Sequence, residues 1–473
     1  MWESDERHWP FGDPHNNYWY SFMEATMLTA LATAGENPRA DEFRQLVRRK
    51  LAGTFVPEWS LPKWAGPGGK EGMHYDKWQR RLWRILSWWR DATGEDYMGK
   101  INVTVSEQID YWLYALAPDR NVELQWGDEP QDSEGYFGDA GRQLLLVLAS
   151  LAPESVQARY AKNMLEHSPW AEFRNRGNYV WDFIYSMRGI NALPIEKRTD
   201  TYLATPAAGS GKTFIRTGWT AKDSVVSYSY RARNGPSGSH DHVDKPGFLW
   251  WANGGYVVGD PNYFTRSGIF GTAQNGGALA GNIVRLESTS VDKQSPNPPL
   301  VVFSEDHSRG TVPYYYHAFD VTELWPSQKL YRREYVYLPP DILVIFDHVI
   351  GPGAKIWQIN TPGKPVADGD VVRVGSVRRG LEVRNVLPRG SQARVVSWVE
   401  SRVAGEQFSG GYRLEFADTA VDSRSLKVLS LNNRVQDAQL VSTVAAGSQV
   451  RITTSAGRIH VRFFDDGSHA AVE

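Results

Sequence analysis

The spacing of the apolar residues changes once along this 473-residue chain, and that change limits the folds open to it. Up to about Arg198, Leu, Ala and Trp recur at intervals of three and four residues, the spacing of an amphipathic helix. Beyond that point Val, Ile, Thr and Tyr alternate in short runs broken by Gly, Asn and Pro, as in antiparallel strands. Helices followed by strands predict an α+β protein with more than one domain.

The first region predicts a series of helices joined by short connections. Its first helix, 18–33, carries apolar residues every three or four positions, and Asn16 or Asn17 precedes it as a cap. Short connections containing Gly, Pro or Asn favour antiparallel helical hairpins. The further helices are expected at 41–51, 75–92, 103–115, 139–151, 154–166 and 179–187.

Four parts are expected along the chain. Residues 1–195 form the helical domain, 196–212 a linker, 213–365 the main antiparallel β-sandwich, and 366–473 a smaller C-terminal β-sheet domain. The main sandwich shows strand patterns at 224–230, 247–252, 256–260, 282–287, 300–305, 329–338 and 342–350.

The linker contains AAGSGKT, which invites comparison with a phosphate-binding loop. That loop requires a glycine at the position of Pro206, and no helical pattern follows here. The segment is therefore predicted to be a turn.

Composition and charge argue against several kinds of partner, metal site and membrane segment. A net charge of -2 without a basic block gives no reason to expect nucleic acid, and zero cysteines exclude disulfides and thiolate zinc sites. No apolar run is long enough to cross a membrane, and the first residues lack the pattern of a signal peptide. A soluble protein is expected, and the sequence sets no oligomeric state.

A histidine-rich segment in the strand region is the strongest chemical signal. His240 and His242 stand two residues apart, so they point to the same face of an extended strand. A turn at 253–255 predicts a β-hairpin that brings Asp260 back toward the histidines. Such a cluster suits a metal or a charged substrate.

Seven segments spread along the chain match the motifs of one family. They are HNNYW (15–19), EGMHYDKW (71–78), ATGEDY (92–97), SHDHVDKPGF (239–248), GYVVGDPNY (255–263), YRREYVYLPPDILVIFDHVIG (331–351) and WQINTPGKP (357–365). Together they resemble the heparinase II/III-like polysaccharide lyases. The resemblance implies an N-terminal α/α toroid of helical hairpins followed by antiparallel β-sandwich domains. Here the toroid would be incomplete and N-terminally shortened, because few helices are present and Asn17 stands near the start.

The resemblance implies a lyase that cleaves an anionic polysaccharide or oligosaccharide containing uronic acid. Such enzymes remove the proton at C5 and expel the 4-O substituent by β-elimination, and Tyr75, Asn17 and His240 match their catalytic residues. Tyr75 would need cationic or hydrogen-bonding neighbours to favour its phenolate, with His74, Arg80 and Arg81 as candidates. The substrate-binding residues implied by the resemblance are Asn16, His15, Tyr18, Glu71, His74 and Arg80.

The resemblance also implies a metal site, usually zinc, with His242 and Asp260 as ligands. The family's next ligand pair falls at 274–275 or 281–282, where no histidine stands, which leaves His307 or His317 as candidates for the third ligand. Without a metal, His242 and Asp260 would instead fix His240 by hydrogen bonds. A further departure is Tyr18, which replaces an expected histidine.

Two other functions remain open at this point. A catalytically impaired, lyase-like protein would bind carbohydrate without cleaving it. A glycoside hydrolase on an α/α toroid would need two opposed carboxylates, for which Asp13, Glu71, Asp76 and Asp139 are available. Relatives are commonly periplasmic or secreted, so export is expected from the resemblance.

Overall fold

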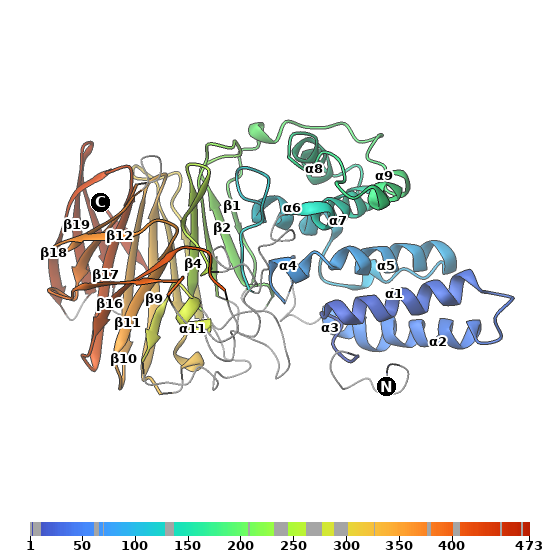
Figure 1. Ribbon diagram of the computed structural model, residues 1–473, viewed down its shortest axis with the longest axis horizontal. Helices are drawn as coiled ribbons and strands as arrows, with labels where there is room; N and C mark the ends of the chain where they lie inside the picture. The colour runs from blue at the N-terminus through green and yellow to red at the C-terminus, as the bar shows by residue number, and fades with distance from the viewer. Residues whose placement is uncertain are drawn as a thin grey trace. The chain divides into compact units, whose positions relative to one another are not determined.

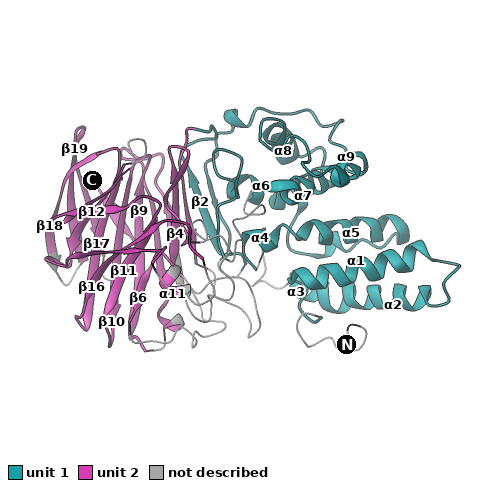
Figure 2. Cartoon of the chain, viewed as in Figure 1, with its two compact units in different colours: residues 1–221, 236–241 teal, residues 222–235, 242–473 magenta. Residues whose placement is uncertain are grey.

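The computed structural model divides into two compact units (Figure 2). The described residues up to Ala221 form the helical unit, and those from Lys222 onward form the sheet unit. The α+β class predicted from the sequence is confirmed. The structure describes residues 2, 11–60, 66–69, 71–127, 137–206, 209–230, 245–261, 277–287, 301–325, 327–375, 380–400, 407–444, 447–464 and 467–473.

The helices of the helical unit lie close to their predicted positions (Figure 1). The expected helix 75–92 is divided into α4 and α5 by a turn at Lys77 and Trp78. Helix α1 packs against α2 and α5, while α6, α7 and α8 pack against one another. The longer helices are α1 (Asn17–Ala32), α2 (Ala40–Lys50), α5 (Gln79–Thr93), α6 (Val105–Ala115), α7 (Gly138–Leu151) and α8 (Val156–Glu166), and the shorter ones are α3 (Val56–Trp59), α4 (Met73–Asp76) and α9 (Tyr179–Ile184).

Local capping explains why these helices start and stop where they do. The side chain of Asn16 accepts a hydrogen bond from the Tyr18 backbone N–H at 2.8 Å, so Asn16 is the cap of α1. Thr104 and Glu107 form a capping box at the start of α6. Gly94 ends α5 in the left-handed conformation. None of the described helices is long and apolar enough to cross a bilayer. Closure of the helices into an incomplete toroid stays a prediction.

The expected linker 196–212 is partly a β-hairpin. Strand β1 (Tyr202–Ala204) pairs with β2 (Lys212–Arg216), and the backbone N–H groups of Gly209 and Gly211 donate to Pro206 O in the intervening turn. A strand instead of a helix follows the GK pair, which confirms that this segment is not a phosphate loop. Arg216 of β2 donates to the backbone carbonyls of Tyr114 and Leu116, which are far from it in the sequence. These hydrogen bonds fix the hairpin to the end of α6 and the residue that follows it.

The sheet unit consists of antiparallel strands. Strands β3 (Val225–Ser229), β4 (Gly247–Ala252) and β5 (Gly255–Val258) pair in sequence. An eight-stranded sheet has the order β12-β13-β14-β17-β10-β9-β8-β7, and two four-stranded sheets have the orders β15-β16-β11-β6 and β18-β19-β20-β21. The remaining bounds are β6 (Val284–Leu286), β7 (Val301–Asp306), β8 (Tyr315–Asp320), β9 (Leu330–Leu338), β10 (Ile342–Ile350), β11 (Lys355–Thr361), β12 (Pro365–Asp368), β13 (Val371–Val374), β14 (Leu381–Leu387), β15 (Ala393–Ser397), β16 (Tyr412–Asp418), β17 (Asp422–Leu431), β18 (Val435–Val444), β19 (Gly447–Thr454), β20 (Gly457–Phe463) and β21 (Ala470–Val472).

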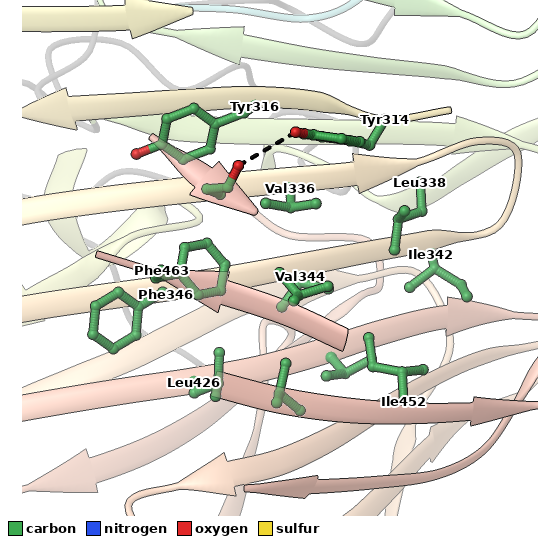
Figure 3. Close-up of a cluster of buried hydrophobic side chains, with 14 of the residues drawn as sticks. Tyr314, Tyr316, Val336, Leu338, Ile342, Val344, Phe346, Leu426, Ile452 and Phe463 are labelled. Atoms are coloured by element: carbon green, nitrogen blue, oxygen red, sulfur yellow. Dashed lines mark hydrogen bonds between the residues drawn. The ribbon is translucent and has the colours of Figure 1, made fainter. Parts of the chain in front are cut away.

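The separate C-terminal domain expected after residue 365 is not present as a compact unit. Strand β17 pairs with β10 along its length, from Ile342 opposite Ser430 to Ile350 opposite Asp422. Strands on both sides of residue 365 therefore share one sheet. One hydrophobic core also joins them, with Phe346 of β10 stacked on Phe463 of β20 (Figure 3). Strands far apart in the sequence thus pair across residue 365, although the change in composition there suggested a domain boundary.

A fully buried ion pair organises the middle of the sheet unit. Arg333 and Asp347, on the neighbouring strands β9 and β10, form a two-point pair with Nη2–Oδ2 at 3.0 Å. The other end of the Arg333 guanidinium donates to Asn282 O at 2.6 Å. The Tyr335 hydroxyl donates to Pro246 O at 2.9 Å. These bonds fix the backbone at residues 246 and 282, on either side of the β4–β5 hairpin in the sequence.

The buried lysine of β17 gives a prediction for the pH dependence of stability. Burial lowers the pKa of Lys427 to about 7, although its Nζ donates to Leu387 O and to Ser425 Oγ. An unfolded lysine has a pKa of about 10.4. Between these values the unfolded chain binds a proton that the folded chain does not, so the free energy of unfolding rises with pH.

The Lys427→Met variant should lack this contribution to the pH dependence. From pH 7 to pH 9 its free energy of unfolding should rise by about 2 kcal/mol less than that of the parent. Urea denaturation of both proteins at the two pH values measures the difference. Parallel pH profiles would show that Lys427 titrates as an exposed lysine does.

Candidate active site in the helical unit

A buried carboxylate joins the two motif segments of the helical unit. Glu71 Oε1 accepts from Asn16 Nδ2 at 2.7 Å, and Oε2 accepts from the backbone N–H of Asn17 at 3.0 Å. Glu71 is only 2% exposed. Its charge lies at the N-terminus of α1, where the helix dipole and N–H groups favour an anion. Segments more than 50 residues apart in the sequence are therefore held at one point.

The glycine-rich turn before Tyr75 is fixed by close packing. Gly68 N–H donates to Gln108 Oε1 at 3.0 Å, and its carbonyl accepts from Gln79 Nε2 at 3.2 Å. A Cβ at Gly69 would lie 1.9 Å from Asp76 Oδ1, so no larger residue fits without displacing that carboxylate. Gly72 has φ +102°, a conformation that favours glycine. Glycine is thus favoured at position 69 by its contacts and at position 72 by its backbone conformation.

Tyr75 lies on the short helix α4 and is half-buried. Its ring meets the His74 ring edge-on, with 4.9 Å between the ring centres. Met73 N–H donates to Trp126 O at 2.9 Å, and Lys77 forms a buried ion pair with Glu123. These contacts on both sides of Tyr75 hold α4 in place.

The three cations expected near Tyr75 have different surroundings. Arg81 turns toward α1, where it bonds to Ser21 Oγ and lies 3.5 Å from Glu24 Oε2. Arg80 donates to Lys77 O at 3.1 Å and lies over the Trp78 ring at 4.1 Å. The His74 ring is in contact with the Tyr75 ring.

Two polar atoms on α1 are buried close to the Glu71 carboxylate. Asn17 Oδ1 and Tyr20 Oη have no hydrogen-bond partner among the described residues. Burial raises the pKa of Tyr20 well above its usual value, and the carboxylates of Glu71, Asp76 and Asp13 raise it further. Tyr20 therefore stays a neutral phenol.

Tyr20 and Asp76 also belong to this site, and the motifs of the sequence did not indicate their places in it. Tyr20 stands three residues after Asn17, a spacing that puts the two on the same face of a helix. That spacing was the available signal. Asp76 comes close to Gly69 because of the turn between them, and no local sequence pattern indicates this contact.

The two other candidates beside the asparagines have different environments. His15 is buried and stacks on Trp59 with 4.9 Å between ring centres, so its ring is part of the helical core. Tyr18 is 50% exposed on the first turn of α1. The side chain at the position of the family histidine thus lies at the surface.

A cavity of about 570 Å³ opens beside this site. His74 and Arg80 line it, and both were predicted to bind substrate. Tyr75 and Asn17 are not among its lining residues. Two predicted substrate contacts therefore line one hollow, and one of them, His74, also contacts the Tyr75 ring.

In the sheet unit, the predicted hairpin before Asp260 is confirmed. Strands β4 and β5 pair through a turn in which Asn253 has φ +52° and Gly254 φ +78°. The pairing of Trp250 with Val258 returns the chain toward the start of β4, and Asp260 is buried there. His240 and His242 lie outside the described residues, so their relation to Asp260 stays a prediction.

Asn282 lies at one position where the resemblance places a metal-ligand pair, and it is a structural cross-link. Its Nδ2 donates to Phe248 O and to Gly259 O, each at 2.8 Å. Its Oδ1 accepts from the backbone N–H of Asn360 at 2.7 Å and from the Asn360 side chain at 3.0 Å. The amide is thus fully used in joining β4, the residue that follows β5, and β11.

The two candidates for a third ligand lie in contrasting environments. His317 is buried beside the Tyr228 and Phe319 rings, and burial lowers its pKa to about 3. His307 is partly exposed, lies 2.9 Å from Glu305 and stacks on Tyr314. Across the described residues, no three His, Asp or Glu side chains form a cluster fit for a metal. The zinc site stays a prediction.

The Glu71 contact gives a testable prediction. In Glu71→Gln one carboxylate oxygen becomes an NH₂ group, which must face the Asn16 amide or the Asn17 N–H, both donors. We expect the helical unit to lose about 1–3 kcal/mol of stability, as for a buried hydrogen bond that is lost. Thermal and chemical denaturation measure this. The exposed Glu36→Gln is the control, and equal stabilities of the two variants would contradict the role of Glu71.

Comparison with known proteins identifies the fold. No protein-family model and no curated protein sequence matches the chain. Among solved structures, heparinase III matches with a TM-score of 0.70 and 13% identity over 95% of this chain and 67% of that chain. Heparan sulfate lyase HepC from Pedobacter heparinus matches with a TM-score of 0.64 and 11% identity, over 95% and 66% of the two chains. This chain therefore spans about two thirds of the length of these structures and has a heparinase-like fold.

Proposed function

We propose that this chain is a polysaccharide lyase that cleaves an anionic polysaccharide or oligosaccharide containing uronic acid by β-elimination. Structures with the same fold include a heparinase and a heparan sulfate lyase. The observation that carries the proposal is the Glu71 carboxylate, which ties Asn16 and Asn17 to the segment that bears Tyr75. It supports a common site for a carboxylate-binding amide and a phenol.

The proposed reaction removes the proton at C5 of the uronic acid, next to its carboxylate. The electron pair of that C–H bond forms the C4–C5 double bond as the bond from C4 to O4 breaks. The departing oxygen takes up a proton, and no water is consumed. Because the C5 proton is weakly acidic, the site must offset the carboxylate charge while a base acts.

Asn17 is proposed to bind the uronate carboxylate. Its backbone N–H is held by Glu71, and its side-chain oxygen has no partner within the described part of the chain. A half-turn of the amide, which exchanges Oδ1 and Nδ2, would break no hydrogen bond of that oxygen and would place an N–H donor there for a carboxylate. The N-terminus of α1 adds a favourable dipole, although the nearby Glu71 charge offsets part of it.

Tyr75 is proposed as the group that takes the C5 proton, returns a proton to the leaving oxygen, or does both. It is half-buried on a well-fixed helical turn, as a base that must reach a substrate should be. His240 is proposed, from the resemblance alone, as the partner that neutralises charge. A zinc bound by His242 and Asp260 and a periplasmic or secreted location are proposals on the same basis.

Binding of carbohydrate without cleavage is the second candidate. It is favoured by Tyr18, whose exposed side chain stands where the family has a histidine. Hydrolysis has less support, because two of the candidate carboxylates are engaged in structure: Asp76 accepts from Glu71 N–H, and Asp139 accepts from three N–H groups.

A panel of uronate polymers tests the proposal. Elimination creates a double bond conjugated to the carboxylate, so ultraviolet absorbance and new reducing ends should increase together. Reducing ends without absorbance would show hydrolysis. Binding with neither signal would leave the chain a carbohydrate-binding protein.

A further inference from the structure

The cavity beside Tyr75 contains a buried donor that lacks an acceptor. Gln143, on the second turn of α7, is 6% exposed and lines the cavity. Its Nε2 has no hydrogen-bond partner within the part of the chain that the structure describes. A buried N–H without an acceptor costs about 1–3 kcal/mol, so this amide is suited to a ligand oxygen.

The start of helix α7 forms one wall of the same cavity. Gly138 and Ala140 line it, and the N-cap residue Phe137 supplies no side-chain cap. The positive end of a 14-residue helix therefore borders the cavity. Asp139 also lines it, but its carboxylate accepts from the backbone N–H groups of Arg174 and Asn175 and from Asn178 Nδ2, at 2.8 to 2.9 Å. These three bonds stabilise the carboxylate and hold the facing loop, and its single negative charge faces those of two arginines.

Two arginines lie over tryptophan rings on the cavity lining. The guanidinium carbon of Arg174 is 3.9 Å from the centre of the Trp170 ring, and that of Arg80 is 4.1 Å from the centre of the Trp78 ring. Stacking of this kind restricts a guanidinium while leaving its N–H groups able to donate. Lys77 also lines the cavity, but Glu123 neutralises it. The excess charge of the lining is therefore positive.

We propose that this cavity is an oxyanion subsite, which binds the carboxylate or sulfate group of a sugar next to the one that is cleaved. The acceptor oxygens of such a group would satisfy Gln143 Nε2 and face Arg174 and the start of α7. The assignment of the cavity to the sugar next to the cleaved one rests on the proposed function. His74 lines the cavity and contacts the Tyr75 ring, so a group bound in the cavity lies beside the candidate base. A volume of about 570 Å³ leaves room for sugar rings.

Binding to Tyr75→Phe protein tests the subsite without turnover. Calorimetry would compare an unsulfated uronate tetrasaccharide, a sulfated one, and a neutral one with reduced carboxyl groups. We expect Gln143→Leu and Arg174→Ala each to weaken binding of the preferred acidic tetrasaccharide about tenfold, which equals about 1.4 kcal/mol. The preferred ligand identifies the group as sulfate or carboxylate.

Arg176→Ala is the matched control, because it removes the same charge from the same loop at a residue that does not line the cavity. If Gln143→Leu does not fold, the exposed Arg174 still decides the result. Equal affinities of Arg174→Ala and Arg176→Ala, equal binding of the neutral tetrasaccharide, or no binding of any tetrasaccharide would overturn the subsite. Anion-selective binding by a parent chain that forms no unsaturated product would instead reject the proposed function and support the subsite.

Discussion

Replacement of Tyr75 by phenylalanine should lower the rate of unsaturated product formation roughly a thousandfold, within the range of general acid–base catalysis. The ring and its contact with His74 remain, while the oxygen that exchanges protons with the substrate is lost. Absorbance of the product, recorded with the polymer that the parent enzyme cleaves fastest, measures the effect. Binding of substrate should change little, so the loss should appear in kcat and not in KM.

Tyr20→Phe is the matched control, because it removes the same atom from a second phenol of the site. Tyr20 is buried, and nearby carboxylates and burial raise its pKa, so it is a poor base. We expect this variant to retain its rate within severalfold. A large loss of rate in Tyr20→Phe, with Tyr75→Phe still active, would show that Tyr75 is not the base.

The second large effect is expected on stability, in the Arg333→Met variant of the sheet unit. Asp347 would stay buried without its cation, and Asn282 O would lose a donor. Breaking one side of a buried pair costs about 3–5 kcal/mol. Denaturation in urea should therefore show a much lower midpoint, and the backbone at residue 282 should lose protection from hydrogen exchange.

Two further variants make this test specific. Arg373→Met removes an exposed arginine of the same sheet, which pairs with Asp368 and with Glu382. It should cost less than about 1 kcal/mol, because Asp368 is exposed and Glu382 keeps its ion pair with Arg384. The double variant Arg333→Met/Asp347→Leu should recover much of the loss, because no unpaired charge stays buried. Equal stabilities of Arg333→Met and Arg373→Met would contradict the role of the buried pair.

The helices could be predicted from the sequence because their determinants are local. Apolar spacing placed α1 and α7 within a residue of their observed starts, and Asn16 caps α1 as one of two predicted candidates. Strand β8 was missed, because its sequence YYHAFD shows neither an alternation of apolar and polar residues nor an unbroken apolar run, although nearly all its residues are buried. The boundary at residue 365 was wrong for a related reason, since the pairing of β10 with β17 joins segments far apart in the sequence.

The candidate site was predictable only in part. The resemblance pointed to Asn16, Asn17, Glu71 and Tyr75, and the structure joins the first three by hydrogen bonds. No spacing rule predicts that Glu71 meets the start of α1, because tertiary packing brings them together. The proposed roles of Gln143 and Arg174 could not be predicted from the sequence either, because the cavity that they line forms only when the helices pack.

Cleavage in water enriched in heavy oxygen tests the central claim most directly. The purified chain would be incubated with a uronate polymer, and its products would be analysed by mass spectrometry. Elimination predicts fragments with one unsaturated uronate end and no heavy oxygen introduced by bond cleavage, once exchange at the reducing end is subtracted. Saturated fragments that carry heavy oxygen from the solvent at the cleaved bond would contradict the account.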